Sequence, residues 1–285
     1  MKLLRFGPKG REKPGLLDSS GAIRDLSKVV KKIDGATLSP AGLKKLKKLK
    51  VEKLPKVRGK PRLGAPIDPI GKLIAVGLNY ADHAAEAGVK IPDEPVLFVK
   101  TPNTYAGPND RIVFPRGWSK MDWEVELAVV IGRRARYVSK EKALRYVAGY
   151  TICNDVSERA FQIDRGGSQW TKGKMCDGFA PLGPYVLTAD EVKDPQALNM
   201  YCDVNGARMQ SGSTKTMIFD VAHLVSYISD FVTLEPGDVI ITGTPPGVGL
   251  GKKPTPIFLK PGDVVTLGID GMGEQRQVCV EPGNR

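Results

Sequence analysis

Short apolar segments separated by Gly, Pro and Asn turns dominate the chain from about residue 70 onwards. Short apolar runs bounded by such turn residues are typical of β-strands. We therefore expect strands over residues 73–76, 96–99, 111–114, 123–131, 146–153, 185–188, 198–204, 239–242, 264–269 and 276–280. The dipeptide Asn205-Gly206 predicts a tight hairpin turn after the strand that precedes it.

Helical patterns are fewer than strand patterns. We expect helices over residues 80–87, closed by Gly88, over 140–145, over part of 156–165 and over 218–231. The fold class is therefore mixed α+β and dominated by β-structure. Residues 1–65 are interpreted as a small β-rich N-terminal domain with a basic helix and a linker, and residues 66–285 as the main domain.

The composition agrees with a globular chain. Of the 285 residues, 41% are hydrophobic and 26% charged, and no apolar run approaches the roughly 18 residues of a membrane span. We therefore expect no membrane partner. The four cysteines lie far apart without a C-x-x-C pair, and the first 15 residues show no apolar signal-peptide region. Both features lead us to expect a protein of the reducing cytoplasm.

The net charge of +12 comes mostly from one segment. Residues 41–62 hold ten Lys or Arg and one Glu. Leu43, Leu46 and Leu49 are spaced by three, so a short helix that starts near Ser39-Pro40 would rest its leucines on the body. A nucleic-acid-binding arm is the alternative, but the segment has no aromatic residue for base stacking. We expect a solvated helix face and no nucleic-acid partner.

The segment "DWEVELAVVIG", residues 122–132, places three acids on alternate positions of a strand. Side chains two apart share one face of a strand, so Asp122, Glu124 and Glu126 form a row. Neighbouring carboxylates repel one another and lose free energy when they are desolvated. Two outcomes are therefore open: the acids face water at the end of the strand, or a cation lies between them.

A third carboxylate follows the next expected strand. The strand over residues 146–153 ends in Asn154-Asp155, and consecutive elements usually lie side by side, so we expect Asp155 beside Glu124 and Glu126. Three carboxylates without His or Cys select a hard divalent cation, for which Mg²⁺ or Mn²⁺ fits best. Asp155 as the N-cap of the following helix is a further role that does not exclude the first.

Histidine occurs twice. His223 lies in an apolar helical pattern and is interpreted as a packed or capping residue. His83 and Glu86 are three apart in "GLNYADHAAEAG" and share a helix face. A carboxylate beside an imidazole orients it and raises its basicity, which suits a general base that acts on water. The helix could order as a lid over a site. An ordinary surface ion pair is the alternative.

Polar side chains are dense after Asp155. Arg159, Gln162 and Lys174 follow it closely, and we expect a carboxylate-bearing substrate to balance these cations. The segment "ITGTPPGVG", residues 241–249, is a Gly/Pro-rich loop whose backbone N–H groups and Thr244 hydroxyl suit an anion. It is not a P-loop, because no Gly-Lys-Ser/Thr follows it.

These motifs together resemble the fumarylacetoacetate hydrolase family. The segments "GLNYADHAAEAG", "FVKTPNTYAGP", "DWEVELAVVIG", "NDVSERAFQ", "QWTKGKMCDGFAPLGP", "VNGARMQSGST" and "ITGTPPGVG" occur in the order seen in that family, over roughly residues 70–280. The resemblance implies a mixed β-roll or barrel fold, a homodimer or a dimer of dimers, and a Mg²⁺ or Mn²⁺ ion held by Glu124, Glu126 and Asp155.

The resemblance also assigns roles to other residues. It implies a lid dyad of His83 and Glu86 and an active-site Lys174, and it leaves Asp122 either as a residue at the entry of the strand or in a supporting position behind the metal. Substrate contacts or support of the metal site are expected of Leu78, Tyr80, Lys100, Tyr105, Arg159, Gln162 and Thr244.

The reaction expected from these parts is hydrolysis of the C3–C4 bond of a 2,4-diketo acid. His83, oriented by Glu86, would take a proton from water, and the hydroxide would attack the C4 carbonyl. Lys174 and the loop over residues 244–247 would hold the anionic end of the substrate. A divalent cation would stabilise the negative charge of the pyruvate enolate that leaves.

The exact substrate is expected to be a sugar-derived 2,4-diketo-3-deoxy acid that gives pyruvate plus lactate. This expectation rests on the start "MKLLRFGPKGREKPG", which resembles members that act on such acids and are often named ureidoglycolate lyases. Family alternatives are an oxaloacetate decarboxylase and a catechol-pathway isomerase, decarboxylase or hydratase. Leu78 stands where many members that act on acylpyruvates or oxaloacetate carry Arg. The loss of that cation disfavours a second carboxylate near the lid, and therefore oxaloacetate. A non-catalytic protein that uses its basic segment to bind an acidic partner is the alternative from another class.

Overall fold

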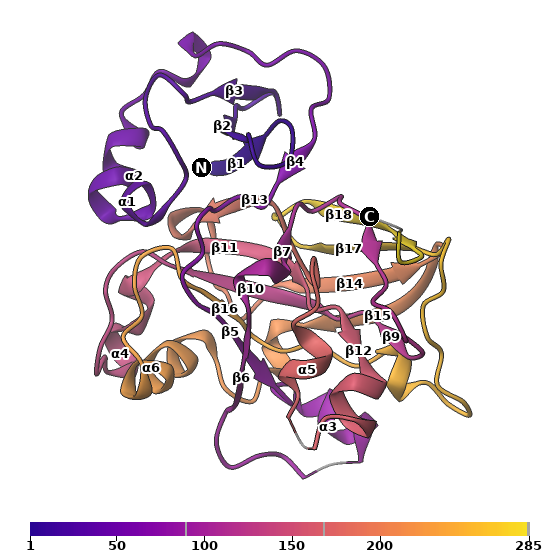
Figure 1. Ribbon diagram of the computed structural model, residues 1–285. Helices are drawn as coiled ribbons and strands as arrows, with labels where there is room; N and C mark the ends of the chain where they lie inside the picture. Colours follow the sequence, from indigo (N-terminus) through magenta and orange to yellow (C-terminus); the bar gives the residue numbers. More distant parts are fainter. Residues whose placement is uncertain (89, 168, 284–285) are drawn as a thin grey trace.

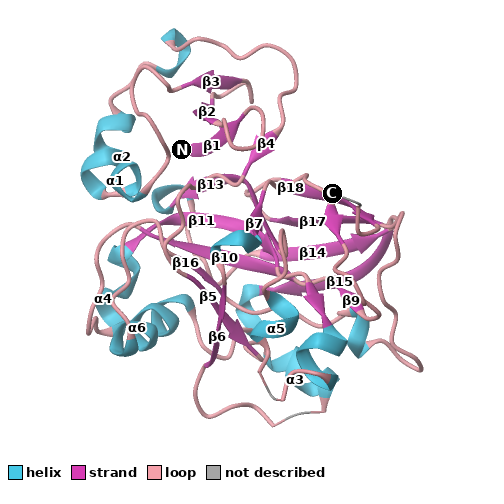
Figure 2. Ribbon diagram, in the orientation of Figure 1, coloured by secondary structure: helices cyan, strands magenta, loops and turns pink. Residues whose placement is uncertain are grey.

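The computed structural model describes residues 1–88, 90–167 and 169–283, apart from the side chains of His83 and Ala87. Strands form most of the body, and the helices are short and peripheral (Figure 2). The helices are α1 (Gly35–Leu38), α2 (Pro40–Lys47), α3 (Ala81–Ala87), α4 (Lys140–Ala143), α5 (Thr171–Lys174) and α6 (Val221–Phe231). Within the described part of the chain, no helix combines the length and the apolar character needed to cross a bilayer.

The largest sheet runs from the N-terminal strands into the body without a break (Figure 1). Its order is β3 (Ile23–Asp25), β2 (Lys13–Leu17), β1 (Lys2–Phe6), β13 (Ala180–Thr188), β11 (Val147–Asn154), β10 (Val125–Ile131), β16 (Val239–Ile241), β5 (Leu73–Gly77) and β6 (Val96–Lys100). Two short strands join this sheet at its sides, β4 (Leu63–Gly64) on β1 and β7 (Tyr105–Ala106) on β13. The predicted boundary at residue 65 falls directly after β4.

A second sheet packs against the first. Its order is β15 (Ala207–Ser213), β14 (Asn199–Val204), β17 (Val264–Ile269), β18 (Glu274–Val280) and β8 (Ile112–Val113). A separate pair consists of β9 (Met121–Asp122) and β12 (Ser157–Glu158). The predicted hairpin is present, because β14 and β15 pair across Asn205-Gly206, where both residues have positive φ.

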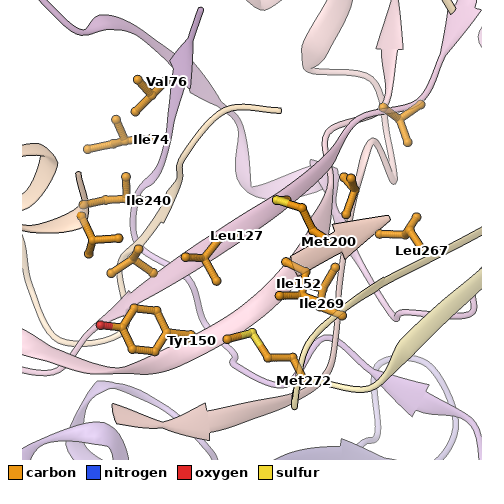
Figure 3. Packing of buried hydrophobic residues seen from close by; sticks show 14 of the residues in the cluster. Ile74, Val76, Leu127, Tyr150, Ile152, Met200, Ile240, Leu267, Ile269 and Met272 are labelled. Atoms are coloured by element: carbon orange, nitrogen blue, oxygen red, sulfur yellow. The ribbon is translucent and has the colours of Figure 1, made fainter. Parts of the chain in front are cut away.

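The main core lies between the two large sheets. Figure 3 shows Leu127 of β10, Ile152 of β11 and Met200 of β14 lying close together, and all three belong to one buried cluster. The opposite face of β10 is buried as well, since Ala128 and Val130 belong to a second cluster. A strand buried on both faces reads as a continuous apolar run, which explains the pattern over residues 127–131.

The basic helix forms where the sequence predicts it. The Ser39 side chain accepts a hydrogen bond from the Gly42 N–H at 3.2 Å, and Pro40 occupies the first turn of α2. Leu46 is fully buried in the second core cluster, and Leu43 and Leu49 pack against that cluster. The expected contact of these leucines with the body is confirmed.

Two element predictions need correction. The strand expected over residues 185–188 begins five residues earlier, as β13. The helix expected within 156–165 is a single π turn, Ala160–Asp164, preceded by β12. The Glu158 carboxylate accepts hydrogen bonds from the N–H groups of Ser119, Lys120 and Phe161, which holds the segment in this shape.

Candidate active site

The row of acids at the start of β10 points into the protein. Asp122, Glu124 and Glu126 are 0%, 6% and 2% exposed, so the interpretation in which they face water is wrong. Trp123 and Val125, on the alternate positions, are buried too. Buried carboxylates require compensating charges or hydrogen bonds, and the surrounding residues supply both.

Strand pairing brings Asp155 to this row. Strands β10 and β11 are antiparallel with Val125 opposite Asn154, and the Asp155 N–H donates to the Glu124 carbonyl at 2.9 Å. One carboxylate oxygen each from Glu124, Glu126 and Asp155 lie within 4.8 Å of one another. Asp155 is not the N-cap of a helix, because β12 follows it directly.

Two buried lysines bind this carboxylate cluster. The Lys174 Nζ donates to Glu124 Oε2 at 2.6 Å and to Asp155 Oδ2 at 2.7 Å. The Lys100 Nζ donates to the other oxygen of Asp155. Burial alone would lower the pKa of Lys174, but the carboxylates of Asp155 and Glu124 outweigh it and raise that pKa. The neighbouring carboxylates therefore favour the charged form of Lys174.

Arg159 connects the first two acids of the row. Its Nη2 donates to Glu124 Oε1 at 2.6 Å, its Nε to Asp122 Oδ2 at 2.8 Å, and its Nη1 to Gln162 Oε1 at 2.9 Å. Burial would lower the pKa of Arg159, yet Asp122 and Glu124 raise it. The protein's own carboxylates already pair with Arg159 and Lys174, and a further contact of these residues with a substrate carboxylate stays a prediction.

Asp122 anchors the start of the strand to a distant loop. Its Oδ1 accepts from the N–H groups of Trp123 at 2.8 Å and Gly249 at 2.6 Å, and its Oδ2 accepts from Leu250 N–H at 3.0 Å. Together with Arg159, these bonds fix four groups around one buried carboxylate. The position agrees with the supporting role expected for Asp122.

The loop after β16 binds anions, but the anions belong to the protein. The Gly243 N–H donates to Glu126 Oε2 at 2.7 Å, and Gly243 has φ +94°, where a side chain would be strained. The Gly247 N–H donates to both carboxylate oxygens of Glu86, at 3.1 and 3.0 Å. The Thr244 hydroxyl donates to the Val125 carbonyl at 3.0 Å, so the hydrogen expected for a substrate is already used.

The lid segment forms the predicted helix. Strand β5 is followed by Leu78, which has φ +53°, and helix α3 ends at Gly88 in the left-handed conformation. Glu86 reaches from α3 to the loop after β16, as its bonds to Gly247 show. The side chain of His83 lies outside the described residues, and its pairing with Glu86 stays a prediction.

A cavity of about 340 Å³ opens beside the acids. Its described lining includes nine of the residues singled out in the sequence: Leu78, Glu86, Glu124, Glu126, Asp155, Arg159, Gln162, Lys174 and Thr244. The other lining residues are Val76, Gly77, Phe98, Ile163, Trp170, Gly243, Val248, Leu250, Gly251 and Lys253.

Three of the residues expected to contact substrate or to support the metal site do not line this cavity. Tyr80 is fully buried and its hydroxyl donates to the Met200 Sδ at 3.3 Å. Lys100 lies behind Asp155 and is also buried. Tyr105 lines a different cavity, beside Arg5, and donates to Asp68 at 2.9 Å. Lys100 thus supports the acids, which is one of the two roles expected of it, whereas Tyr80 and Tyr105 do not line the cavity.

The donor set fits a divalent metal ion. Glu124 and Asp155 already have cationic partners, whereas Glu126 accepts from a backbone N–H. Burial, and then the charges of Asp155 and Glu124, raise the pKa of Glu126 well above its ordinary value. Added positive charge is therefore most stabilising between these three groups. Oxygen ligands alone match the preference of Mg²⁺, Mn²⁺ or Ca²⁺.

Comparison with known proteins identifies the family. Residues 72–280 match the family described as "Fumarylacetoacetate (FAA) hydrolase C-terminal". The chain belongs to the fumarylacetoacetate hydrolase family. The predicted fold class, mixed α+β and dominated by β-structure, is thereby confirmed together with the family's fold.

Individual family members are similar over nearly the whole chain. A Burkholderia ambifaria protein named "Putative hydrolase" is 58% identical over 97% of this chain and 98% of its own length. The structure of maleylpyruvate hydrolase from Sphingobium sp. SYK-6 in complex with manganese(II) and pyruvate is 27% identical, with a TM-score of 0.83 over 99% of this chain and all of the other. The 2-hydroxyhepta-2,4-diene-1,7-dioate isomerase of Mycobacterium marinum is 34% identical, with a TM-score of 0.74 over both whole chains.

Sequence reasoning missed part of the site of this family member. Phe98 and Trp170 line the cavity. Phe98 lies in an ordinary strand pattern and Trp170 in a polar segment, so neither pattern indicated a residue of the site. Gly243 and Gly247 were assigned to an anion loop, but their protein partners were not foreseen. The contact between Gly247 and Glu86 spans 161 residues of sequence, and spacing carries no signal for it.

Proposed function

We propose that this enzyme hydrolyses the C3–C4 bond of a 2,4-diketo acid. Water adds across the broken bond, so the acyl half leaves as a carboxylic acid and the remainder as pyruvate. The observation that carries the proposal is the cluster of Glu124, Glu126 and Asp155 on the floor of the cavity. The pyruvate and manganese(II) bound by a maleylpyruvate hydrolase of the same fold support it.

Glu124, Glu126 and Asp155 would hold the divalent ion. When bound, that ion supplies Lewis-acid stabilisation of the negative charge that develops on the pyruvate half. The protein holds these ligands in place before any ion binds. Arg159 fixes one oxygen of Glu124, the Gly243 N–H fixes one of Glu126, and the lysines fix Asp155.

Lys174 would position the pyruvate half of the substrate. A lysine ammonium has three donors, and Glu124 and Asp155 accept two of them. Since Lys174 lines the cavity, its third donor is available to a substrate carboxylate. The ammonium would thus contribute positive charge next to the bond that breaks.

Glu86 would contribute to the activation of water. It lies on α3, lines the cavity, and is held by the Gly247 N–H. His83 is one helical turn from Glu86, and we propose it as the group that takes the proton from water. Holding Glu86 against the loop after β16 would also keep α3 over the cavity and limit the access of bulk water.

The test measures pyruvate release from a panel of 2,4-diketo acids, with oxaloacetate and a dienoic diacid as controls for decarboxylase and isomerase activity. We expect pyruvate from the diketo acids, loss of turnover with a chelator, and recovery with Mg²⁺ or Mn²⁺. Glu126→Gln should lose at least about 100-fold in kcat/KM. Glu235→Gln, at a surface carboxylate that pairs with Arg134, is the matched control and should stay fully active.

Full activity of Glu126→Gln, or turnover that persists in chelator, would refute the metal-assisted scheme. Release of carbon dioxide from oxaloacetate without cleavage of any diketo acid would instead favour the decarboxylase alternative. The panel also includes the sugar-derived acid that gives pyruvate plus lactate, because the resemblance of the N-terminal segment makes it a candidate substrate.

We also propose that the enzyme is a homodimer or a dimer of dimers. The family resemblance supports this, and so do large apolar side chains on the surface of the single chain: Val99 is 54% exposed, Tyr137 69% and Phe231 60%. Such side chains are typical of surfaces that another chain covers. Sedimentation at micromolar concentration should give a multiple of the 30.9 kDa chain mass, and a monomer would contradict the proposal.

A further inference from the structure

The cavity combines a charged floor with an apolar wall. The floor consists of the acids and Lys174. The wall residues, which we call the acyl wall, are Leu78, Phe98, Ile163, Trp170, Val248 and Leu250. They come from separate parts of the chain and meet only in the fold. Figure 1 shows α5, which carries Lys174 and follows Trp170, beside β6, which carries Phe98.

The acyl wall begins directly at the floor. The Lys174 Nζ lies 5.4 Å from the centroid of the Phe98 ring. The Phe98 and Trp170 rings meet edge to face at 5.7 Å with an interplanar angle of 66°. A substrate with its keto-acid end at Lys174 would therefore meet an aromatic surface with its next atoms. The charged floor and the acyl wall would therefore contact successive parts of the same substrate.

A glycine makes room for the largest member of the wall. A Cβ atom at Gly77 would lie 2.1 Å from Cζ3 of Trp170, which is closer than any real contact. The indole thus packs directly on the backbone at the end of β5. This fit keeps the ring at the edge of the cavity instead of in solvent, so its face is part of a shaped surface.

Part of the acyl wall is open to water. Ile163 is 52% exposed and Leu250 37% exposed, although both line the cavity. Covering such surface with an apolar group is favourable, at roughly fourfold in affinity for each buried methylene. A hydroxyl or charged group would lose hydrogen bonds to water wherever these apolar side chains cover it, because they offer no donor or acceptor in return. Lys253 also lines the cavity, so a substrate with a terminal carboxylate is the competing ligand to be tested.

We propose that the acyl half of the substrate is an apolar chain or ring longer than acetyl, bound on the acyl wall. The inference rests on the proposed function and narrows it. The cavity volume of about 340 Å³ falls within the roughly 300–1,000 Å³ of small-molecule sites, so it admits a group larger than lactoyl. The sugar-derived acid is then a poorer substrate than an alkyl acid of greater length.

The experiment measures kcat/KM for pyruvate release from acetyl-, butanoyl- and hexanoylpyruvate, from the lactoyl compound, and from a hexanoyl analogue with a terminal carboxylate. We expect kcat/KM to rise about three- to fourfold per added methylene until the chain outgrows the cavity. The lactoyl and terminal-carboxylate compounds should lie below the alkyl acids of equal length.

Variants of the wall test its role separately. Trp170→Ala should lower kcat/KM for hexanoylpyruvate about tenfold or more but for acetylpyruvate less than about threefold. Leu250→Ala should do the same to a smaller extent. The matched control for Leu250→Ala is Leu144→Ala, because Leu144 lies near α4 and is 43% exposed, compared with 37% for Leu250. This control should leave the ratios of kcat/KM between the substrates unchanged.

The outcomes separate the two proposals. If no 2,4-diketo acid yields pyruvate, the proposed function fails. If pyruvate is released but kcat/KM is flat along the alkyl series, or highest for the lactoyl or terminal-carboxylate compound, the acyl wall does not select the substrate and the inference is overturned. An equal loss for acetyl- and hexanoylpyruvate in Trp170→Ala would also overturn it.

Discussion

Replacing Asp122 with Asn should destabilise the fold even though the two side chains have the same shape. The Asp122 carboxylate is fully buried and accepts four hydrogen bonds, one of them from Arg159. An amide offers one acceptor oxygen and two donors, so two of the four bonds would be replaced by facing donors. Asp122→Asn therefore removes a negative charge and places the N–H groups of the amide against two N–H donors of the protein.

The magnitude follows from these contacts. Breaking a buried ion pair by removing one partner costs about 3–5 kcal/mol, because the remaining charge stays buried. Arg159 keeps its bond to Glu124, which favours the lower half of that range. A loss of about 3–4 kcal/mol in the free energy of unfolding would lower Tm on the order of 10 °C. Gly249 and Leu250 would lose their anchor at the same time.

The assay is urea unfolding of both proteins, followed by far-UV circular dichroism. The matched control is Asp203→Asn, at a carboxylate that pairs with Arg208 on the surface, where Arg208 is 53% exposed. The control should change the free energy of unfolding by no more than about 1 kcal/mol. If Asp122→Asn falls within that same range, the carboxylate does not hold Arg159 and the loop as described.

Two further stability predictions concern other parts of the chain. Gln210→Leu should cost about 2–4 kcal/mol by urea unfolding, since its buried amide bonds the Val125 N–H at 3.0 Å and Thr244 at 2.8 Å; a loss below 1 kcal/mol would refute this. Burial would raise the pKa values of Glu12 and Asp110, but hydrogen bonds and charge from Arg62 outweigh it and lower them from the ordinary 4.5 and 3.8. Arg62 therefore stabilises the fold fully above pH 4.5, and the difference in unfolding free energy between wild type and Arg62→Met should shrink as the pH falls below about 4. A difference that grows on acidification would contradict this.

The sequence predicted the central cluster because it depends on local order. Two strands that follow one another usually pair, and the antiparallel pairing of β10 with β11 places Asp155 next to Glu124. The alternation of acids along residues 122–126 then fixes which side chains face the cluster. Both facts are visible within about 35 residues of sequence.

The supports of the cluster could not be predicted in the same way. Asp122 is bonded by Gly249 and Leu250, and Glu86 by Gly247, all more than a hundred positions away. Backbone N–H groups are present at almost every residue, so their use leaves no mark in the sequence. The continuation of the N-terminal strands into the main sheet through β1 and β13 likewise depends on a pairing between distant segments.

The orientation of the basic helix α2 could be predicted from the sequence. The spacing of Leu43, Leu46 and Leu49 predicted which side of α2 is buried, and the structure agrees. Lys47, which follows Leu43 by four residues at the edge of this side, pairs with Asp190 at 2.9 Å, and both side chains are about half exposed. The charge of this segment therefore fits a solvated surface, as its periodicity indicated.

The central claim is that Glu124, Glu126 and Asp155 together hold a divalent cation. Its most direct measurement is anomalous scattering from a crystal of the protein soaked in Mn²⁺. The account predicts one strong peak within coordination distance, about 2.0–2.6 Å, of an oxygen from each of the three carboxylates. A peak that contacts fewer than two of them, or Mn²⁺ bound only elsewhere on the chain, would contradict it.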